Sequence, residues 1–388
     1  MARRRESQDQ IAIVGASAAG LLTAHALARA GREPQVFEGQ EQLDSAARTL
    51  IVTDRMRDIL GGIGEKAVVN EIRQFELFTD GRVAKIALRR PDLVIERNTL
   101  ITELAGAAQA AGASLHLGQK LISLHQHDHT LTMVRECAQG GRIEDSQFRT
   151  VVGADGAVSR VAQAAGWPKP RTVPLVQAIV NLPKGMTPDT VRVWFIPDDT
   201  PYFYWLIPHS PTEGVVGLIG EDGAEARHVL ECFLAKHHLE PYGFQGARIP
   251  VYTGWMPVRR QLPGGDVYLV GDAAAHVKVT TVGGIVTGFR GALGVAEAIM
   301  NGGSSAKLHA LRLELNIHLL IRKLIHGFKQ GQYSHLVDIL NSRARRDLEA
   351  HTRDEPAGLL LRLCLHQPRM LLLGLRALMT GGSFSQHS

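Results

Sequence analysis

The sequence predicts an α/β protein: a Rossmann-like nucleotide-binding domain, a second domain built on an antiparallel sheet, and a helical C-terminus. Three observations predict it. The chain opens with an apolar strand, a small-residue turn and an alanine-rich helix; a middle region alternates as strands do; and the last third has helical periodicity. We expect the first domain to comprise residues 8–170 and 259–305, the second 171–258, and the helical region 306–388.

The first strand and helix enclose a predicted phosphate turn. Ile11–Val14 has the pattern of a buried strand, helix Ala18–Ala30 follows, and Pro34–Glu38 forms the next strand. Small side chains let a pyrophosphate approach the backbone N–H groups at the helix N-terminus. An acid at the end of the second strand accepts hydrogen bonds from ribose hydroxyls. The predicted contacts are Gly15, Ser17, Ala18, Ala19, Gly20, Glu38 and Gly39.

The region that follows mixes helices and hairpins. We expect a helix at Thr53–Leu60, a hairpin around Asp80-Gly81, a helix from Thr99 to Ala111, and a second hairpin around Asp128. Two arginines, Arg48 and Arg97, are candidates for charge-assisted hydrogen bonds to a phosphate chain, although either could equally form a surface ion pair.

Two further turns of the nucleotide-binding type occur later in the chain. Strand Val151–Gly153 leads into Asp155-Gly156, and strand Val267–Gly271 ends at Asp272. Gly283-Gly284 then opens a helix that runs to Met300, and the N-terminus of this helix favours negative charge. Asp155 either organises its loop or contacts a nucleotide. Three such turns in one chain predict a long dinucleotide contacted at both ends, and therefore a flavoenzyme.

The second domain and the C-terminus are distinguished by composition and periodicity. Residues 170–258 alternate as strands do and are rich in tryptophan, tyrosine and proline, with one helix at Ala224–His238. Further helices are expected at Leu308–Gly327, Leu336–His351 and Gly358–Met379. Leu308–Gly327 and Gly358–Met379 mix leucines with basic residues and histidines, so we expect them either to pack on the nucleotide-binding domain or a dimer partner, or to lie on a membrane surface. Gly358–Met379 carries too many polar residues to cross a bilayer.

The overall composition excludes several classes of function. Of 388 residues, 45% are hydrophobic, and the net charge is only +5, without a basic block interleaved with aromatics, so no nucleic-acid partner is expected. Three scattered cysteines indicate a reducing cytoplasm. His125, His127 and His129 alternate along one hairpin, which favours a solvent-facing side over a metal site. The oligomeric state is left open.

The three turns, taken with Arg97 at the start of its helix, resemble those of the p-hydroxybenzoate hydroxylase superfamily. The resemblance covers most of residues 10–300 and implies an FAD-binding domain of the glutathione reductase type. It makes Arg48 and Arg97 expected flavin contacts, together with Asp155, Gly271, Asp272, Gly283 and Gly284. NADPH or another reductant is the expected electron donor.

Within the superfamily, two segments look most like those of the geranylgeranyl reductase family. One is the small-residue loop Gly271–Ile285, and the other is Phe203–Pro208, which is similar to the reductases' lipid-site motif. This resemblance implies a small hydrophobic substrate and the reduction of C=C bonds in a prenyl chain. The aromatic residues Tyr204 and Trp205 are expected to face the substrate, and His276 and Lys278 are the expected polar contacts or proton donors.

Other functions remain open at this point. A flavin monooxygenase that hydroxylates or epoxidises an aromatic or polyene compound would share the fold and the turns. Phe203–Pro208 is also close to a motif of flavin-dependent halogenases, but Lys66 and Lys85 lie in unsuitable contexts for the lysine that those enzymes need. A third possibility is a flavin-binding carrier or sensor without turnover.

Overall fold

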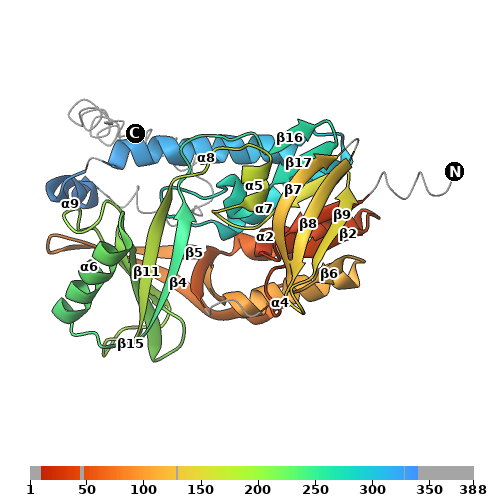
Figure 1. Ribbon diagram of the computed structural model, residues 1–388. Coiled ribbons are helices and arrows are strands. Elements are labelled where there is room, and N and C mark those ends of the chain that lie inside the picture. Colours follow the sequence, from red (N-terminus) through yellow and green to blue (C-terminus); the bar gives the residue numbers. More distant parts are fainter. Residues whose placement is uncertain (1–9, 44–47, 128–129, 327, 340–388) are drawn as a thin grey trace.

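The computed structural model describes residues 10–43, 48–127, 130–326 and 328–339 (Figure 1). Its first sheet has six strands in the order β16-β17-β10-β1-β2-β6, and every pairing except β16–β17 is parallel. The strands are β1 (Ile11–Val14), β2 (Pro34–Phe37), β6 (Ser114–His116), β10 (Thr150–Gly153), β16 (Arg259–Leu262) and β17 (Gly265–Leu269).

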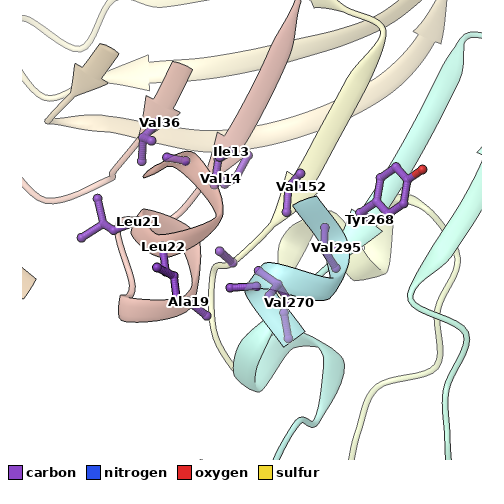
Figure 2. Close-up of a cluster of buried hydrophobic side chains, with 14 of the residues drawn as sticks. Ile13, Val14, Ala19, Leu21, Leu22, Val36, Val152, Tyr268, Val270 and Val295 are labelled. Atoms are coloured by element: carbon purple, nitrogen blue, oxygen red, sulfur yellow. The ribbon is translucent and has the colours of Figure 1, made fainter. Parts of the chain in front are cut away.

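Helices pack on this sheet and complete its core. They are α2 (Ala18–Arg29), α4 (Arg97–Ala110) and α7 (Ile285–Met300). All four residues of β1 are buried, as expected for a central parallel strand. Figure 2 shows Ile13 and Val152 of neighbouring strands lying beside Leu22 of α2 and Val295 of α7. The carboxyl ends of the parallel strands β1, β10 and β17 lie at one edge of the sheet, and β1 leads into the N-terminus of α2 there.

The second sheet has eight strands in the order β15-β11-β14-β13-β12-β4-β5-β3. Helix α6 (Gly223–Lys236) packs against one of its faces through Phe233 and Leu230. The strands are β3 (Thr49–Thr53), β4 (Val68–Thr79), β5 (Arg82–Glu96), β11 (Thr172–Asn181), β12 (Thr190–Trp194), β13 (Tyr204–Pro208), β14 (Glu213–Ile219) and β15 (Pro241–Pro250).

This sheet departs from the expectation in two respects. It is antiparallel except at one pair, because β12 runs parallel to β4 with Thr190 opposite Gln74. It also takes β3, β4 and β5 from residues 49–96, a segment that the sequence analysis placed with the nucleotide-binding domain. The sheet expected within residues 171–258 therefore includes strands from both halves of the chain. The α/β class itself is confirmed.

The remaining elements are smaller. A three-stranded sheet contains β7 (Gln119–His127), β8 (Thr130–Cys137) and β9 (Ile143–Phe148), of which only the first hairpin was predicted. Short helices are α3 (Arg55–Leu60) and α5 (Arg160–Ala164), with one-turn 3₁₀ helices η1 (Glu65–Ala67) and η2 (Gly271–Ala274).

Two helices follow the nucleotide-binding region. Helix α8 (Ala306–Ile325), in blue, runs across the top of Figure 1 from the side of the six-stranded sheet to the side of the eight-stranded sheet. Helix α9 (Gln330–Ile339) comes next. The predicted helix Gly358–Met379 and most of Leu336–His351 lie outside the described residues. Among the helices that the structure describes, none is long and apolar enough to cross a membrane.

Candidate active site

The first turn is built so that only glycine fits at its two ends. Gly15 has a φ of +102°, and a Cβ there would lie 2.6 Å from the carbonyl oxygen of Ala154. A Cβ on Gly20 would lie 2.3 Å from the carbonyl oxygen of Gly15. Between them, Ser17 caps α2, and its hydroxyl accepts a hydrogen bond of 3.2 Å from the Gly20 N–H. The close backbone packing opens the N-terminus of α2 to an anion.

Glu38 lies across this turn at the end of the second strand. Its Oε2 accepts from the Ala16 N–H at 2.8 Å, and its Oε1 accepts from the Gln40 N–H at 3.0 Å. The carboxylate is thereby fixed beside the turn, where it and Gly39 border a cavity of about 390 Å³. We call this the turn cavity. Its other lining residues include Gly15, Lys120, Asp155 and Arg160.

A second cavity, of about 270 Å³, lies between the two large sheets. We call it the apolar cavity, because most of its lining is aliphatic or aromatic. Ser17, Arg97, Ala154 and Gly156 border both cavities, which therefore meet at the first turn. Most of the apolar lining comes from strands of the eight-stranded sheet, namely Leu50, Phe75, Leu175, Val193, Trp205, Ile207, Ile219 and Ile249, and Phe203 just before β13 adds to it.

Three charged side chains gather where the cavities meet. Strand pairing places Thr49 opposite Glu96. The backbone N–H of Arg97 donates to the backbone carbonyl of Arg48 at 3.3 Å, so the two arginines are neighbours. Burial lowers the pKa of Arg48, which neighbouring Arg97 lowers further and Asp272 opposes. Burial raises the pKa of Asp272, and both arginines counteract that rise. The junction therefore holds two guanidinium groups and one carboxyl.

The third turn forms the opposite side of this junction. Gly271 has a φ of +64°, and a Cβ there would lie 2.9 Å from the Cβ of Ala19. A Cβ on Gly284 would lie 3.3 Å from Oδ1 of Asp272. Gly284 is the N-cap of α7, and both it and Gly283 line the apolar cavity. The N-terminus of a second long helix therefore points at the same space.

The family model described as an FAD binding domain matches residues 8–309, which include all three turns. The chain belongs to this FAD-binding family. It is a flavin-dependent oxidoreductase.

The chain is similar to several known proteins and solved structures. A digeranylgeranylglycerophospholipid reductase of Methanothrix thermoacetophila is 23% identical over 309 residues, which are 76% of this chain and 78% of that protein. A geranylgeranyl bacteriochlorophyll reductase-like structure from Thermoplasma acidophilum has a TM-score of 0.77 at 17% identity, covering 95% of this chain and 100% of that one. The p-nitrophenol 4-monooxygenase of Pseudomonas putida DLL-E4 has a TM-score of 0.63 at 18% identity, covering 96% and 98%. The two structural likenesses establish the shared fold.

The residues at the junction fit FAD. Nε of Arg48 is buried and has no hydrogen-bond partner within the described part of the chain, so it is available to an anionic group. The cradle of Gly15 and Gly20 admits a pyrophosphate where a Cβ would exclude it. The turn cavity beside Glu38 suits the adenosine end, and the apolar cavity below Gly284 suits the ring. The role of each predicted contact stays a prediction.

Asp155 has a different part in this arrangement. Its carboxylate accepts from the Ser159 hydroxyl at 2.5 Å, the Arg160 N–H at 2.7 Å and the Val161 N–H at 3.2 Å. Because these bonds hold Ser159, the N-cap of α5, and the first two N–H groups of that helix, the Asp155 side chain organises the loop, which is the first of the two expected roles. Asp155 still borders the turn cavity.

Tyr204 and Trp205, expected together at the substrate, lie on opposite faces of β13. Trp205 lines the apolar cavity, and Gly217 on the neighbouring strand leaves room for its ring. Tyr204 instead stacks on Phe233 of α6 at 4.0 Å, and its hydroxyl donates to Asp199 at 2.9 Å. Successive residues of a strand point to opposite faces, so only one of the pair can face the substrate. The expectation for Tyr204 is corrected.

Of His276 and Lys278, only Lys278 borders the apolar cavity. Lys278 lines the apolar cavity, and its backbone N–H donates to the Gly283 carbonyl at 3.2 Å. His276 does not line it. Its ring is 1% exposed, stacks on Trp255 with centroids 5.7 Å apart, and lies against Gly291 of α7. Burial lowers the pKa of His276 to about 3. Its position therefore gives no support to the expected role as proton donor.

Sequence reasoning missed the strand that closes the apolar cavity on the side of Arg48. Strand β3 contributes Thr49 through Thr53 to the lining, whereas the analysis expected a helix from Thr53 and no strand before it. The run Thr49-Leu-Ile-Val-Thr53 is rich in β-branched residues, which was a usable signal. Gln177, which borders the same wall, carried no such signal.

Proposed function

We propose that this oxidoreductase reduces C=C bonds in a long hydrophobic, prenyl-type substrate. The observation that carries the proposal is the apolar cavity, because it adjoins the N-terminus of α7 and has an aliphatic and aromatic lining beyond the charged junction. Apolar walls with few polar groups are typical of sites for hydrocarbon chains. The 23% identity with the digeranylgeranylglycerophospholipid reductase supports the same substrate class.

The chain's own residues would bind and protect the substrate. FAD, when bound, supplies the redox chemistry. Phe203 and Trp205 would hold the reacting bond against the junction, and the aliphatic wall would exclude water. Lys278 is 4% exposed and lines the cavity from the loop that follows Asp272. We assign its Nζ the contact that supplies a proton to the product.

Anaerobic turnover tests the proposal directly. The FAD-loaded protein, reduced with dithionite, is mixed with geranylgeraniol, and the product is analysed by mass spectrometry. We expect a gain of one hydrogen pair for each reduced bond. The matched control is Gly20→Ala, which should lack FAD. An unchanged alcohol, with FAD bound and reduced, would contradict the reductase proposal.

A monooxygenase is the second candidate, and the size of the apolar cavity favours it. The cavity measures about 270 Å³, including the end at Gly284 that suits the flavin ring, and is slightly smaller than the roughly 300–1,000 Å³ usual for ligand sites, which suits an aromatic substrate better than a full prenyl chain. The p-nitrophenol 4-monooxygenase shares the fold. In air, substrate-dependent consumption of dioxygen with gain of oxygen in the product would select this candidate. A carrier would show no substrate-stimulated reoxidation at all.

The halogenase alternative has less support. Lys66 is highly exposed and pairs with Glu103 at 3.6 Å, while Lys85 pairs with Glu76 at 3.0 Å. Neither lysine borders either cavity. Both therefore have the contacts of surface ion pairs.

We also propose peripheral contact with a membrane surface and NADPH as the electron donor. Leu313 and Leu320 are half exposed, lie seven residues apart, and so share the outer face of α8. Co-sedimentation with anionic liposomes tests the contact, and Leu313→Gln with Leu320→Gln should reduce it. Flavin bleaching by NADPH, compared with NADH, under nitrogen tests the donor.

A further inference from the structure

Helix α8 contacts both walls of the apolar cavity, although most of it lies beyond residue 309, where the family match ends. Four of its side chains lie on one stripe, since they follow one another at intervals of four, three and four residues. They are Leu311, Leu315, His318 and Arg322. The first three are buried, and Arg322 is partly buried.

The first wall is the loop that follows Asp272. His318 Nδ1 and the Thr280 hydroxyl form a hydrogen bond of 2.7 Å. The preceding residue, Val279, packs in one cluster with Leu311 and Leu315. The loop's cavity side carries Lys278 and Thr281. Helix α8 thus contacts the back of the loop whose front lines the cavity.

The second wall is the segment that enters β13. Nη2 of Arg322 donates to the Pro201 carbonyl at 2.9 Å, and its guanidinium lies 4.1 Å from the centre of the Tyr202 ring. The next residue along the chain, Phe203, lines the cavity, as does Trp205. The same helix therefore contacts the backs of both walls.

The helix is anchored beyond these contacts. At its start, Lys307 Nζ pairs with Glu297 of α7 at 2.7 Å, and Arg290 of α7 pairs with Glu314. After its end, Tyr333 of α9 stacks on Phe195 at 4.8 Å. Helix α8 is therefore held at one end by α7, which packs on the six-stranded sheet, and is followed by a contact just after β12 of the eight-stranded sheet.

We propose that α8 is a spacer that sets the separation of the two cavity walls, with His318 and Arg322 as positioning residues that determine which chain length the cavity accepts. Arg322 follows His318 by four positions, an advance of about 6 Å along the helix axis, which fixes the offset between the two contacts. The part that concerns chain length rests on the proposed function.

Hydrogen exchange of the FAD-loaded protein tests the positioning without any substrate. His318→Leu should accelerate amide exchange in residues 278–283, and Arg322→Met should accelerate it in residues 202–205. His318→Asn, which can keep the bond to Thr280, should restore slow exchange. Arg312→Met is the matched control, because Arg312 is exposed on the same helix. Exchange in both walls equal to that of the control would overturn the proposal.

Binding of two prenyl alcohols tests the selection of chain length. Dissociation constants for farnesol and geranylgeraniol are measured from the change in flavin absorbance. Arg322→Met should change their ratio about tenfold, equivalent to roughly 1.4 kcal/mol, with FAD affinity unchanged. An unchanged ratio would overturn the role in selection. If the unmodified protein binds neither alcohol, the proposed substrate class fails, and the exchange result alone decides whether α8 positions the walls.

Discussion

The Nε2 atom of Gln177 donates a hydrogen bond of 3.2 Å to the carbonyl oxygen of Thr49. The same atom donates to Oε1 of Gln245 at 2.5 Å, and that oxygen accepts from the Thr49 N–H at 3.2 Å. Thr49 begins β3 and Gln245 lies in β15, which are the two edge strands of the eight-stranded sheet. Two glutamine side chains therefore bind the backbone of the opposite edge and hold it beside Arg48.

Gln177→Leu should break this connection. The change leaves the Thr49 carbonyl without its partner and removes one of the two donors to Oε1 of Gln245, which keeps the Thr49 N–H, so we expect a loss of about 1–3 kcal/mol in the free energy of unfolding. FAD affinity should fall as well, because the residue before Thr49 is Arg48. Urea unfolding and FAD titration measure both effects. Gln109→Leu, at an exposed position, should change neither.

Gly20→Ala should abolish FAD binding. The new methyl group would lie 2.3 Å from the Gly15 carbonyl oxygen and 2.8 Å from the Ala154 Cβ, so the turn must open. Gly106→Ala in α4 is the matched control, since no atom lies within 4 Å of its Cβ position. It should stabilise the protein by about 0.5–1 kcal/mol. Flavin content after purification distinguishes the two variants.

Arg48→Met should weaken FAD binding by about ten- to a hundredfold, as expected for the loss of a hydrogen bond to a charged group. Isothermal titration of the apoprotein measures the change. Arg89 is exposed and borders neither cavity, so Arg89→Met removes the same charge and should have no effect. Equal affinities for the two variants would show that Arg48 does not contact the cofactor.

Tyr204→Phe should lower stability, whereas Trp205→Phe should raise KM. Tyr204→Phe removes the bond to Asp199 behind the sheet, so stability should fall by about 1 kcal/mol with turnover unchanged. Trp205→Phe alters the cavity wall, so KM should rise while FAD content stays constant. Steady-state kinetics and thermal unfolding of both variants provide the comparison. A large loss of turnover in Tyr204→Phe would contradict the assignment of faces.

His276 should contribute to acid sensitivity. Its pKa is about 3 in the folded protein and about 6.5 in an unfolded chain, so the unfolded state binds more protons between these values. Stability is therefore intact above pH 6.5 and falls on acidification by up to about 1.4 kcal/mol per pH unit. In His276→Phe this contribution to the pH dependence of the unfolding free energy should be absent. Urea unfolding of both proteins from pH 7 to pH 4 measures the difference.

The sequence predicted the local parts of the fold well. Strand Ile11–Val14, its turn and helix α2 depend on residues that are adjacent in the chain, so their pattern is readable. Arg97 and Asp272 could also be predicted, because each lies beside a recognised helix or strand. Arg48 became an expected flavin contact through the family resemblance, since strand β3 beside it was missed.

Nonlocal relationships could not be read in the same way. Alternation along β13 shows that Tyr204 and Trp205 face opposite sides, but the choice between them depends on where α6 packs. His276 lies within the expected loop Gly271–Ile285, but its ring packs against Gly291 of α7 instead of lining the cavity. The residue before it, Ala275, has a left-handed backbone conformation with a φ of +51°, which the sequence does not indicate. The pairing of β4 with β12 joins residues more than a hundred positions apart.

The interleaving of the two large sheets constrains how the protein is made on the ribosome. Strand β1 is among the first segments synthesised, but its neighbour β10 ends at Gly153, and β17 arrives only at Gly265–Leu269. Strands β4 and β5 must likewise wait for β12. Neither sheet can close while the nascent chain is short, and FAD can be enclosed only after Gly284 has emerged. Premature termination before that point should yield a chain that requires chaperones rather than a smaller working domain.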